Sequence, residues 1–138
     1  MKNLCLLLVC GFVVCTLLAR IESAHAIDPF KKEFEAKYVK ADPSTPEEKS
    51  LAAAVKQAKC NVCHVGTKKK DRNAYGDALD GLLDKKADIK NKAKIQDALD
   101  KVADMKSKKD DPNSPTFGEL IKQGKLPGGE DATQSAAK

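Results

Sequence analysis

The chain has 138 residues, a length that allows one small domain. Its 25 basic residues exceed its 20 acidic residues and give a net charge of +5. Because acidic residues are interspersed among the basic ones nearly everywhere, the charge pattern argues against a nucleic-acid partner.

The first 26 residues have the layout of a secretory signal peptide. A basic start precedes an apolar run over residues 4–19, and Ala24 and Ala26 form an A-x-A cleavage site. We expect cleavage after Ala26, a periplasmic or otherwise exported location, and no stable membrane insertion afterwards. The alternative is a retained membrane anchor, but the apolar run is shorter than the roughly 20 residues that span a bilayer.

Cleavage would change the inventory of thiols and imidazoles. Residues 1–26 contain three of the five cysteines and one of the two histidines. The mature chain would then keep only Cys60, Cys63 and His64 of these types.

The remaining chain divides into a lead segment, a main domain and a tail. In the lead segment, residues 27–43, aromatic side chains four residues apart predict one face of a short helix, which Asp42-Pro43 ends. Residues 44–129 form the expected domain. Residues 130–138 are small and polar, and we expect this tail to be disordered.

Helical patterns follow one another through the domain. Thr45, Pro46 and Glu48 predict a capped helix start, and this helix runs directly into Cys60. A second amphipathic helix is expected after an N-cap at Asp71, a third over residues 92–106, and a short fourth one after a capping box at Thr116 and Glu119. With no convincing strand, the expected fold class is all-α.

One motif carries the chemistry, the C-x-x-C-H of residues 60–64. This motif is a signature of covalent c-type haem attachment. Two thiols one helical turn apart can each add to a haem vinyl group, and the adjacent histidine can supply the proximal nitrogen to the iron. We therefore expect one haem c bound through Cys60 and Cys63, with His64 as an iron ligand.

Three other roles are possible for the cysteines and the histidine of this motif. Cys60 and Cys63 could form a structural disulfide, which an exported protein can keep. A thioredoxin-like dithiol would accompany a βαβ pattern, which does not occur here. A zinc site needs four ligands, usually Cys or His, and the mature chain has three.

The segment KCNVCH at the end of a helix, followed by GTKKKDRNAYGDALDGLL, resembles the soluble, all-helical, monohaem c-type cytochromes. FKKEFEAKYV in the lead segment and the closing SPTFGELIKQGKLPGG resemble small exported cytochrome-c-like proteins of planctomycete-type bacteria. The resemblance implies a cytochrome-c-like fold of about four short helices around one covalently bound haem. It also implies an electron carrier that passes single electrons between partners, and not an enzyme.

The second axial ligand is less defined. Cytochromes of this kind usually supply a methionine, and Met105 is the one methionine of the mature chain. Met105 would lie on the third helix in line with Leu99 and Val102, where it could instead be a core residue. A lysine or an open sixth position are the alternatives, and an open position would favour a haem-based sensor or a small-ligand-binding module.

A basic cluster follows the motif at Lys68, Lys69, Lys70 and Arg72. Such a run is either a solvated loop or a docking patch for an acidic redox partner. Arg72, together with Asn73 and Tyr75, could also hold haem propionates. We expect the protein to be a monomer.

Overall fold

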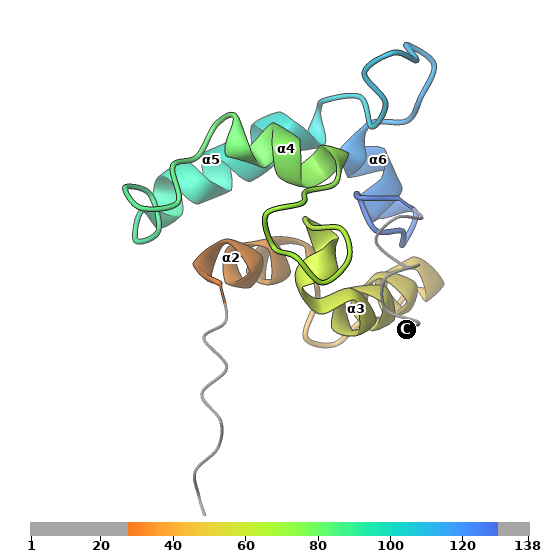
Figure 1. Ribbon diagram of the computed structural model, residues 1–138. Coiled ribbons are helices and arrows are strands. Elements are labelled where there is room, and N and C mark those ends of the chain that lie inside the picture. The colour runs from red at the N-terminus through yellow and green to blue at the C-terminus, as the bar shows by residue number, and fades with distance from the viewer. Residues whose placement is uncertain (1–27, 130–138) are drawn as a thin grey trace, which may run out of the picture.

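The computed structural model describes residues 28–129, and the predicted signal peptide and disordered tail lie outside them. These residues form five α-helices and one short 3-10 helix, shown in Figure 1. In chain order they are α2 (Pro29–Tyr38), α3 (Pro46–Ala58), η1 (Lys59–Val62), α4 (Ala74–Asp80), α5 (Lys92–Ala103) and α6 (Phe117–Lys122). The described residues contain isolated β-bridges and no strand, so the all-α fold class is confirmed.

The predicted capping boxes begin two of the helices. Thr45 caps α3 by accepting a hydrogen bond from the Glu48 backbone, and the Glu48 carboxylate accepts one from the Thr45 backbone. Thr116 and Glu119 make the same reciprocal pair at the start of α6. Because each box satisfies backbone N–H groups that a helix leaves free at its start, the sequence marks both starts correctly.

The second predicted helix begins two residues later than expected. Its N-cap is Asn73, whose side chain accepts a hydrogen bond from the Gly76 backbone at 3.0 Å. Asp71 instead closes the preceding loop, because its carbonyl accepts a hydrogen bond from the Val65 backbone at 2.9 Å. The prediction of Asp71 as the N-cap was therefore wrong.

The third predicted helix is shorter than expected. α5 ends at Ala103, and the Met105 backbone N–H turns back to the carbonyl of Val102 at 3.0 Å. The Met105 carbonyl then accepts a hydrogen bond from the Phe117 backbone at 3.0 Å. These bonds turn the chain out of the helix, so Met105 does not lie on α5.

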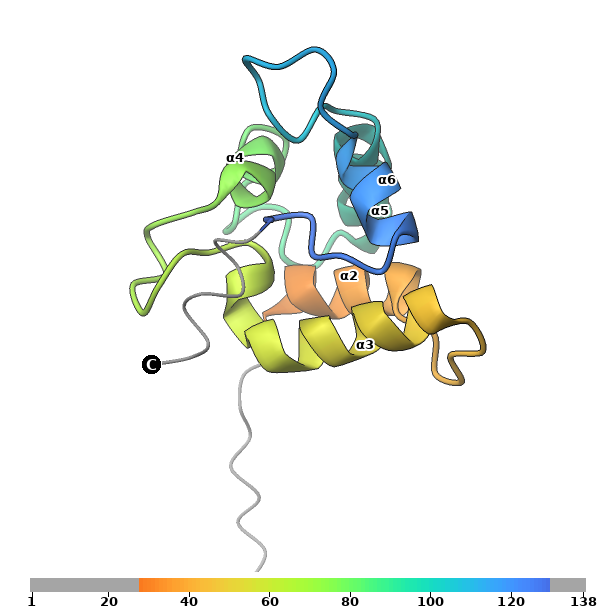
Figure 2. The same ribbon diagram turned by 90° about the vertical axis from the view of Figure 1, so that its right-hand side faces the viewer.

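The helices form two layers, which Figures 1 and 2 show from two directions. α2 and α3 lie in one layer, and α4, α5 and α6 lie in the other. α2 and α5 run parallel to each other: Glu33 in the middle of α2 pairs with Lys92 at the start of α5, and Lys37 near the end of α2 pairs with Asp100 near the end of α5. The lead segment is thus part of the same packing unit as residues 44–129.

An aromatic group joins the two layers. The ring of Tyr75 on α4 lies 5.8 Å from that of Phe34 on α2 and 5.2 Å from that of Phe117 on α6, both edge to face. All three side chains are buried. Edge-to-face aromatic pairs add to the stabilisation from burial alone, so this group holds α2, α4 and α6 together. Across residues 28–129, no helix is long and apolar enough to cross a membrane.

Candidate functional site

The C-x-x-C-H motif forms one tight turn at the end of α3. Cys60 lies within η1, which begins where α3 ends. The Cys60 carbonyl accepts hydrogen bonds from the backbone N–H groups of Cys63, at 3.3 Å, and His64, at 3.2 Å. The structure therefore brings both thiols and the imidazole to a single turn, which we call the motif turn (residues 60–64).

The two thiols of the motif turn lie in different environments. Cys60 is exposed, whereas Cys63 is half-buried and packs against the hydrophobic core. Both are free thiols. Burial raises the pKa of Cys63 to about 12, so this thiol stays protonated at neutral pH.

His64 is held in its neutral form. Burial lowers the pKa of the His64 imidazole, and this effect is larger than the opposing effect of the Asp71 backbone. Its Nδ1 atom is buried and has no hydrogen-bond partner within residues 28–129. Because a metal ion binds the neutral imidazole, this environment suits a metal ligand.

Met105 is not brought together with His64. Cys63 and His64 lie close enough to Asp28, at the start of α2, for its charge to act on both. Met105 follows the end of α5, and the end of α5 lies beside the end of α2. The ten residues of α2 span about 15 Å, which separates the ends beside which the two residues lie.

The side chain of Met105 also differs from the prediction of a core residue. Met105 is 41% exposed, whereas Val102 is fully buried. The prediction that Met105 packs inward in line with Val102 was therefore wrong, because α5 ends at Ala103. The prediction that Met105 binds iron stays a prediction.

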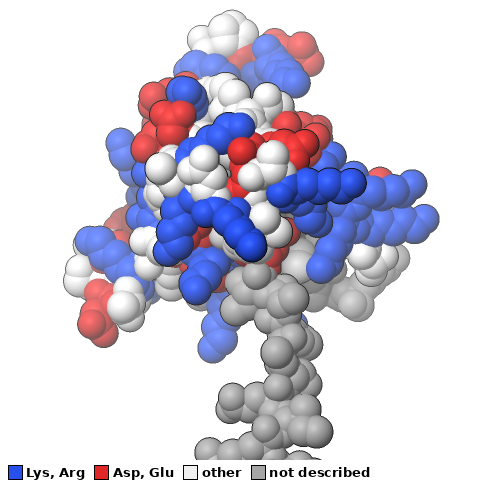
Figure 3. Space-filling view, turned by 90° about the vertical axis from the view of Figure 1, so that its left-hand side faces the viewer, with Lys and Arg blue, Asp and Glu red and all other residues white. Residues whose placement is uncertain are grey.

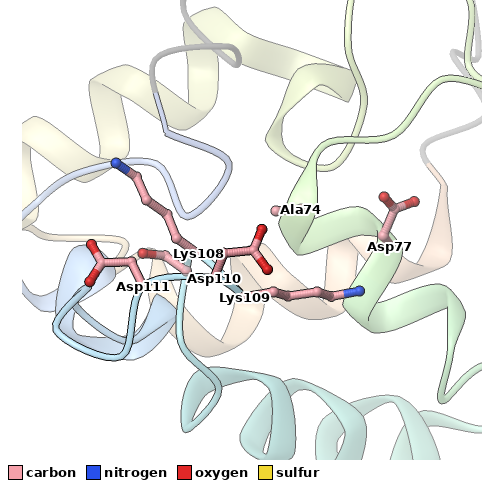
Figure 4. A pocket seen from close by; sticks show the side chains of 7 residues that line it. Ala74, Asp77, Lys108, Lys109, Asp110 and Asp111 are labelled. Atoms are coloured by element: carbon pink, nitrogen blue, oxygen red, sulfur yellow. The ribbon is translucent and has the colours of Figure 1, made fainter.

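A cavity of about 520 Å³ lies between α4 and the loop that follows α5, as Figure 4 shows. It is lined by Ala74 and Asp77 on one side and by residues 107–111 on the other. Charged side chains, including Lys109, Asp110 and Asp111, surround it. None of the three motif residues lines this cavity.

The basic cluster is only partly free. Lys68, Lys69 and Lys70 are exposed on the loop that Asp71 closes. Arg72 instead pairs with Asp80 at 2.6 Å. Figure 3 shows many basic side chains over one face of the molecule with acidic ones among them, so the charge of that face is mixed.

Asn73 and Tyr75, the other two residues that could hold haem propionates, differ in their hydrogen bonding. The Tyr75 hydroxyl is buried and has no hydrogen-bond partner in the described part of the chain. Asn73 is buried and bound to the motif turn itself. The sequence did not predict this contact of Asn73, and the one signal it carries is that Asn is a favoured N-cap residue.

A multi-ligand metal site finds no support. Within residues 28–129 no group of three or more His, Cys, Asp and Glu side chains is placed to hold a metal ion.

Comparison of the chain with protein-family models, with curated proteins and with solved structures finds no match.

Proposed function

We propose that this chain is an exported c-type cytochrome that carries single electrons. One haem c would be bound covalently through Cys60 and Cys63, and His64 would supply a nitrogen ligand to its iron. The observation that carries the proposal is the motif turn, where two free thiols and a neutral imidazole share one turn at the end of a capped helix. A cytochrome-c-like arrangement of the helices is part of the same proposal.

The chemistry of attachment is an addition. Each cysteine sulfur would bond to one carbon of a vinyl group, and the thiol hydrogen would go to the other carbon, so the step needs no external oxidant. The partly core-packed Cys63 and the exposed Cys60 would fix the cofactor at the surface end of the motif turn. When bound, the iron would supply one-electron transfer by changing between its ferric and ferrous states.

A thioredoxin-like dithiol has less support. Such a dithiol would accompany a βαβ pattern, and the described residues form helices and no strand.

A second function has one observation in its favour. Met105 and His64 lie at opposite ends of α2, so an iron bound to His64 would lack a methionine in this arrangement. An iron with an open sixth position binds small molecules. A haem-based sensor or small-ligand-binding module is therefore the alternative to the electron carrier.

The decisive experiment is production of the protein together with a c-type haem maturation system. We expect purified protein with the mass of one covalent haem, which remains bound after denaturation. Replacing Cys60 and Cys63 by serine should abolish covalent haem. Asn61→Ala, which alters the same turn but keeps both thiols, should retain it. Purified wild-type protein with only the apoprotein mass would refute the proposal.

Carbon monoxide separates the two functions. An electron carrier with six bound ligands should show a reduced spectrum that carbon monoxide leaves unchanged. An open iron should bind carbon monoxide and change its spectrum, which would favour the sensor.

The expected partner is an acidic redox protein. Lys68, Lys69 and Lys70 lie on the loop next to His64 and are exposed, so they are available for docking. Replacing Lys69 and Lys70 by glutamine should slow electron transfer to an acidic partner protein at low ionic strength. Replacing Lys108 and Lys109, which removes the same charge from another loop, should have a smaller effect. Equal effects would indicate that only net charge matters.

A further inference from the structure

Asn73 is bound to the motif turn by three hydrogen bonds. Its side-chain Nδ2 donates to the carbonyls of Asn61 and Val62, at 3.1 Å each, and its backbone N–H donates to the carbonyl of Cys63 at 3.2 Å. One residue therefore pairs with three successive carbonyls, those of Asn61, Val62 and Cys63. Its Oδ1 accepts the hydrogen bond from Gly76 that caps α4, so the same side chain joins the helix to the turn.

Close packing leaves the Asn73 side chain little freedom. Asn73 is 4% exposed. A β-carbon at Gly128 would lie 2.1 Å from its Nδ2 atom, which places the closing segment of the chain directly on the amide. The amide is thus enclosed between the motif turn on one side and Gly128 on the other.

These bonds fix the backbone on which His64 is mounted. The His64 N–H is bound to the Cys60 carbonyl, and the peptide before it is held by Asn73 through the Cys63 carbonyl. A β-bridge between His64 and Arg72 continues the same pairing. Groups that hold a metal ligand in place from outside the coordination sphere control its orientation.

We propose that Asn73 is a positioning residue that sets the orientation of the His64 imidazole by holding the motif turn. This role rests on the proposed function, because the imidazole orientation is read out through a bound haem iron. Asn73 itself would not touch the iron.

The test uses Asn73→Ser in haem-loaded protein. Serine is as good an N-cap as asparagine, so α4 should keep its start, but serine lacks the two N–H donors that hold Asn61 and Val62. We expect a changed pattern of the paramagnetically shifted haem methyl resonances in the ferric protein, because that pattern depends on the plane of the axial imidazole. We also expect a higher reduction potential, because a histidine held less firmly stabilises ferric iron less.

The matched control is Asn91→Ser. Asn91 caps α5 through a hydrogen bond from Lys94 to its side-chain oxygen at 3.1 Å, as Asn73 caps α4. This variant should leave both the resonance pattern and the potential at the wild-type values. Equal changes in the two variants would overturn the positioning role, since they would come from replacing an N-cap asparagine and not from losing the bonds to the motif turn.

Gly128→Ala provides a second route to the same question if Asn73→Ser fails to fold. The added methyl group would press on the Asn73 amide from outside the motif turn and should change the resonance pattern in the same way. Wild-type protein without covalent haem would refute the proposed function. If the wild-type protein carries haem, and both variants have the same resonance pattern and reduction potential as the wild type, only the role of Asn73 would be refuted.

Discussion

The α-carbon of Gly76 lies against the carbonyl group of Cys63, so closely that a β-carbon at residue 76 would be 2.0 Å from the Cys63 oxygen. The opposing atoms belong to the backbone and cannot turn away as a flexible side chain can. α4 can pack on the motif turn only because residue 76 is glycine.

Gly76→Ala should therefore lower the free energy of unfolding by about 1–3 kcal/mol, the usual cost of an added carbon in a packed interior. Gly81→Ala is the control, because its β-carbon would meet no atom closer than 3.5 Å. That variant should change stability little. Urea unfolding of both variants measures the difference, and equal losses would mean that the Cys63 contact is not the cause.

Tyr75→Phe should raise the free energy of unfolding by about 1 kcal/mol, because it removes a buried hydroxyl that has no partner in the described chain. The ring would keep its contacts with Phe34 and Phe117.

Tyr38→Phe should instead lower the free energy of unfolding by about 1 kcal/mol. The Tyr38 hydroxyl donates a hydrogen bond to the Leu99 carbonyl at 3.1 Å, and the variant would lose it.

These two tyrosine variants can be compared by thermal or urea unfolding of protein with and without haem. A loss of stability in Tyr75→Phe that occurs only with haem would show that the hydroxyl has a partner on the cofactor, as a propionate would be.

Acid stability should depend on Glu48. The hydrogen bond from Lys40, followed by those from the Ser44 and Thr45 backbone, lowers the pKa of Glu48 from 4.5 to about 2. The folded state therefore holds this carboxylate ionised more strongly than the unfolded chain does. Its contribution to stability is complete above pH 4.5 and is lost as the pH falls from about 4.5 to about 2.

Glu48→Gln should lower stability at pH 7 and flatten the fall in stability across that acid range. Glu47→Gln removes the same charge from the neighbouring residue outside the capping box and should keep the wild-type slope. Unfolding midpoints at pH 2.5, 3.5, 4.5 and 7 give the comparison, since the lower three values fall between the two pKa values of about 2 and 4.5 and pH 7 lies above both. A wild-type slope in Glu48→Gln would contradict the assignment.

Met105→Ala should leave the spin state of the haem-loaded protein and its response to carbon monoxide unchanged. The reason is the placement of Met105 beside the end of α2, away from His64. Absorption spectra of the ferric and ferrous proteins measure this. Conversion of a low-spin wild type to a high-spin variant would instead establish Met105 as the sixth ligand, with the end of α5 rearranged around the iron.

The elements that the sequence predicted well are those set by neighbouring residues. The capping boxes at Thr45 and Thr116 need only a partner three residues away, so the pattern itself locates the helix starts. The motif turn is likewise local, and the three residues expected to act together do lie on one turn.

The features that the sequence did not predict depend on distant partners. Asp71 and Asn73 are equally good N-cap residues by type, and the pairing of Asp71 with Val65 decides between them. The end of α5 is set in part by the bond from Phe117 to the Met105 carbonyl. A helical periodicity cannot locate such an end, because the apolar spacing continues past it.

Asp28 and Gly128 stand at the two ends of the described chain, and both lie at the candidate site. The Asp28 charge acts on Cys63 and His64, and Gly128 packs on the Asn73 amide that holds the same turn. An attachment made directly at either end of the described residues, such as a tether or a fused electron-transfer domain, would therefore begin next to the motif turn. With the proposed haem in place, such an attachment could shield the cofactor from a freely diffusing partner, or could deliver a tethered partner to it at high effective concentration.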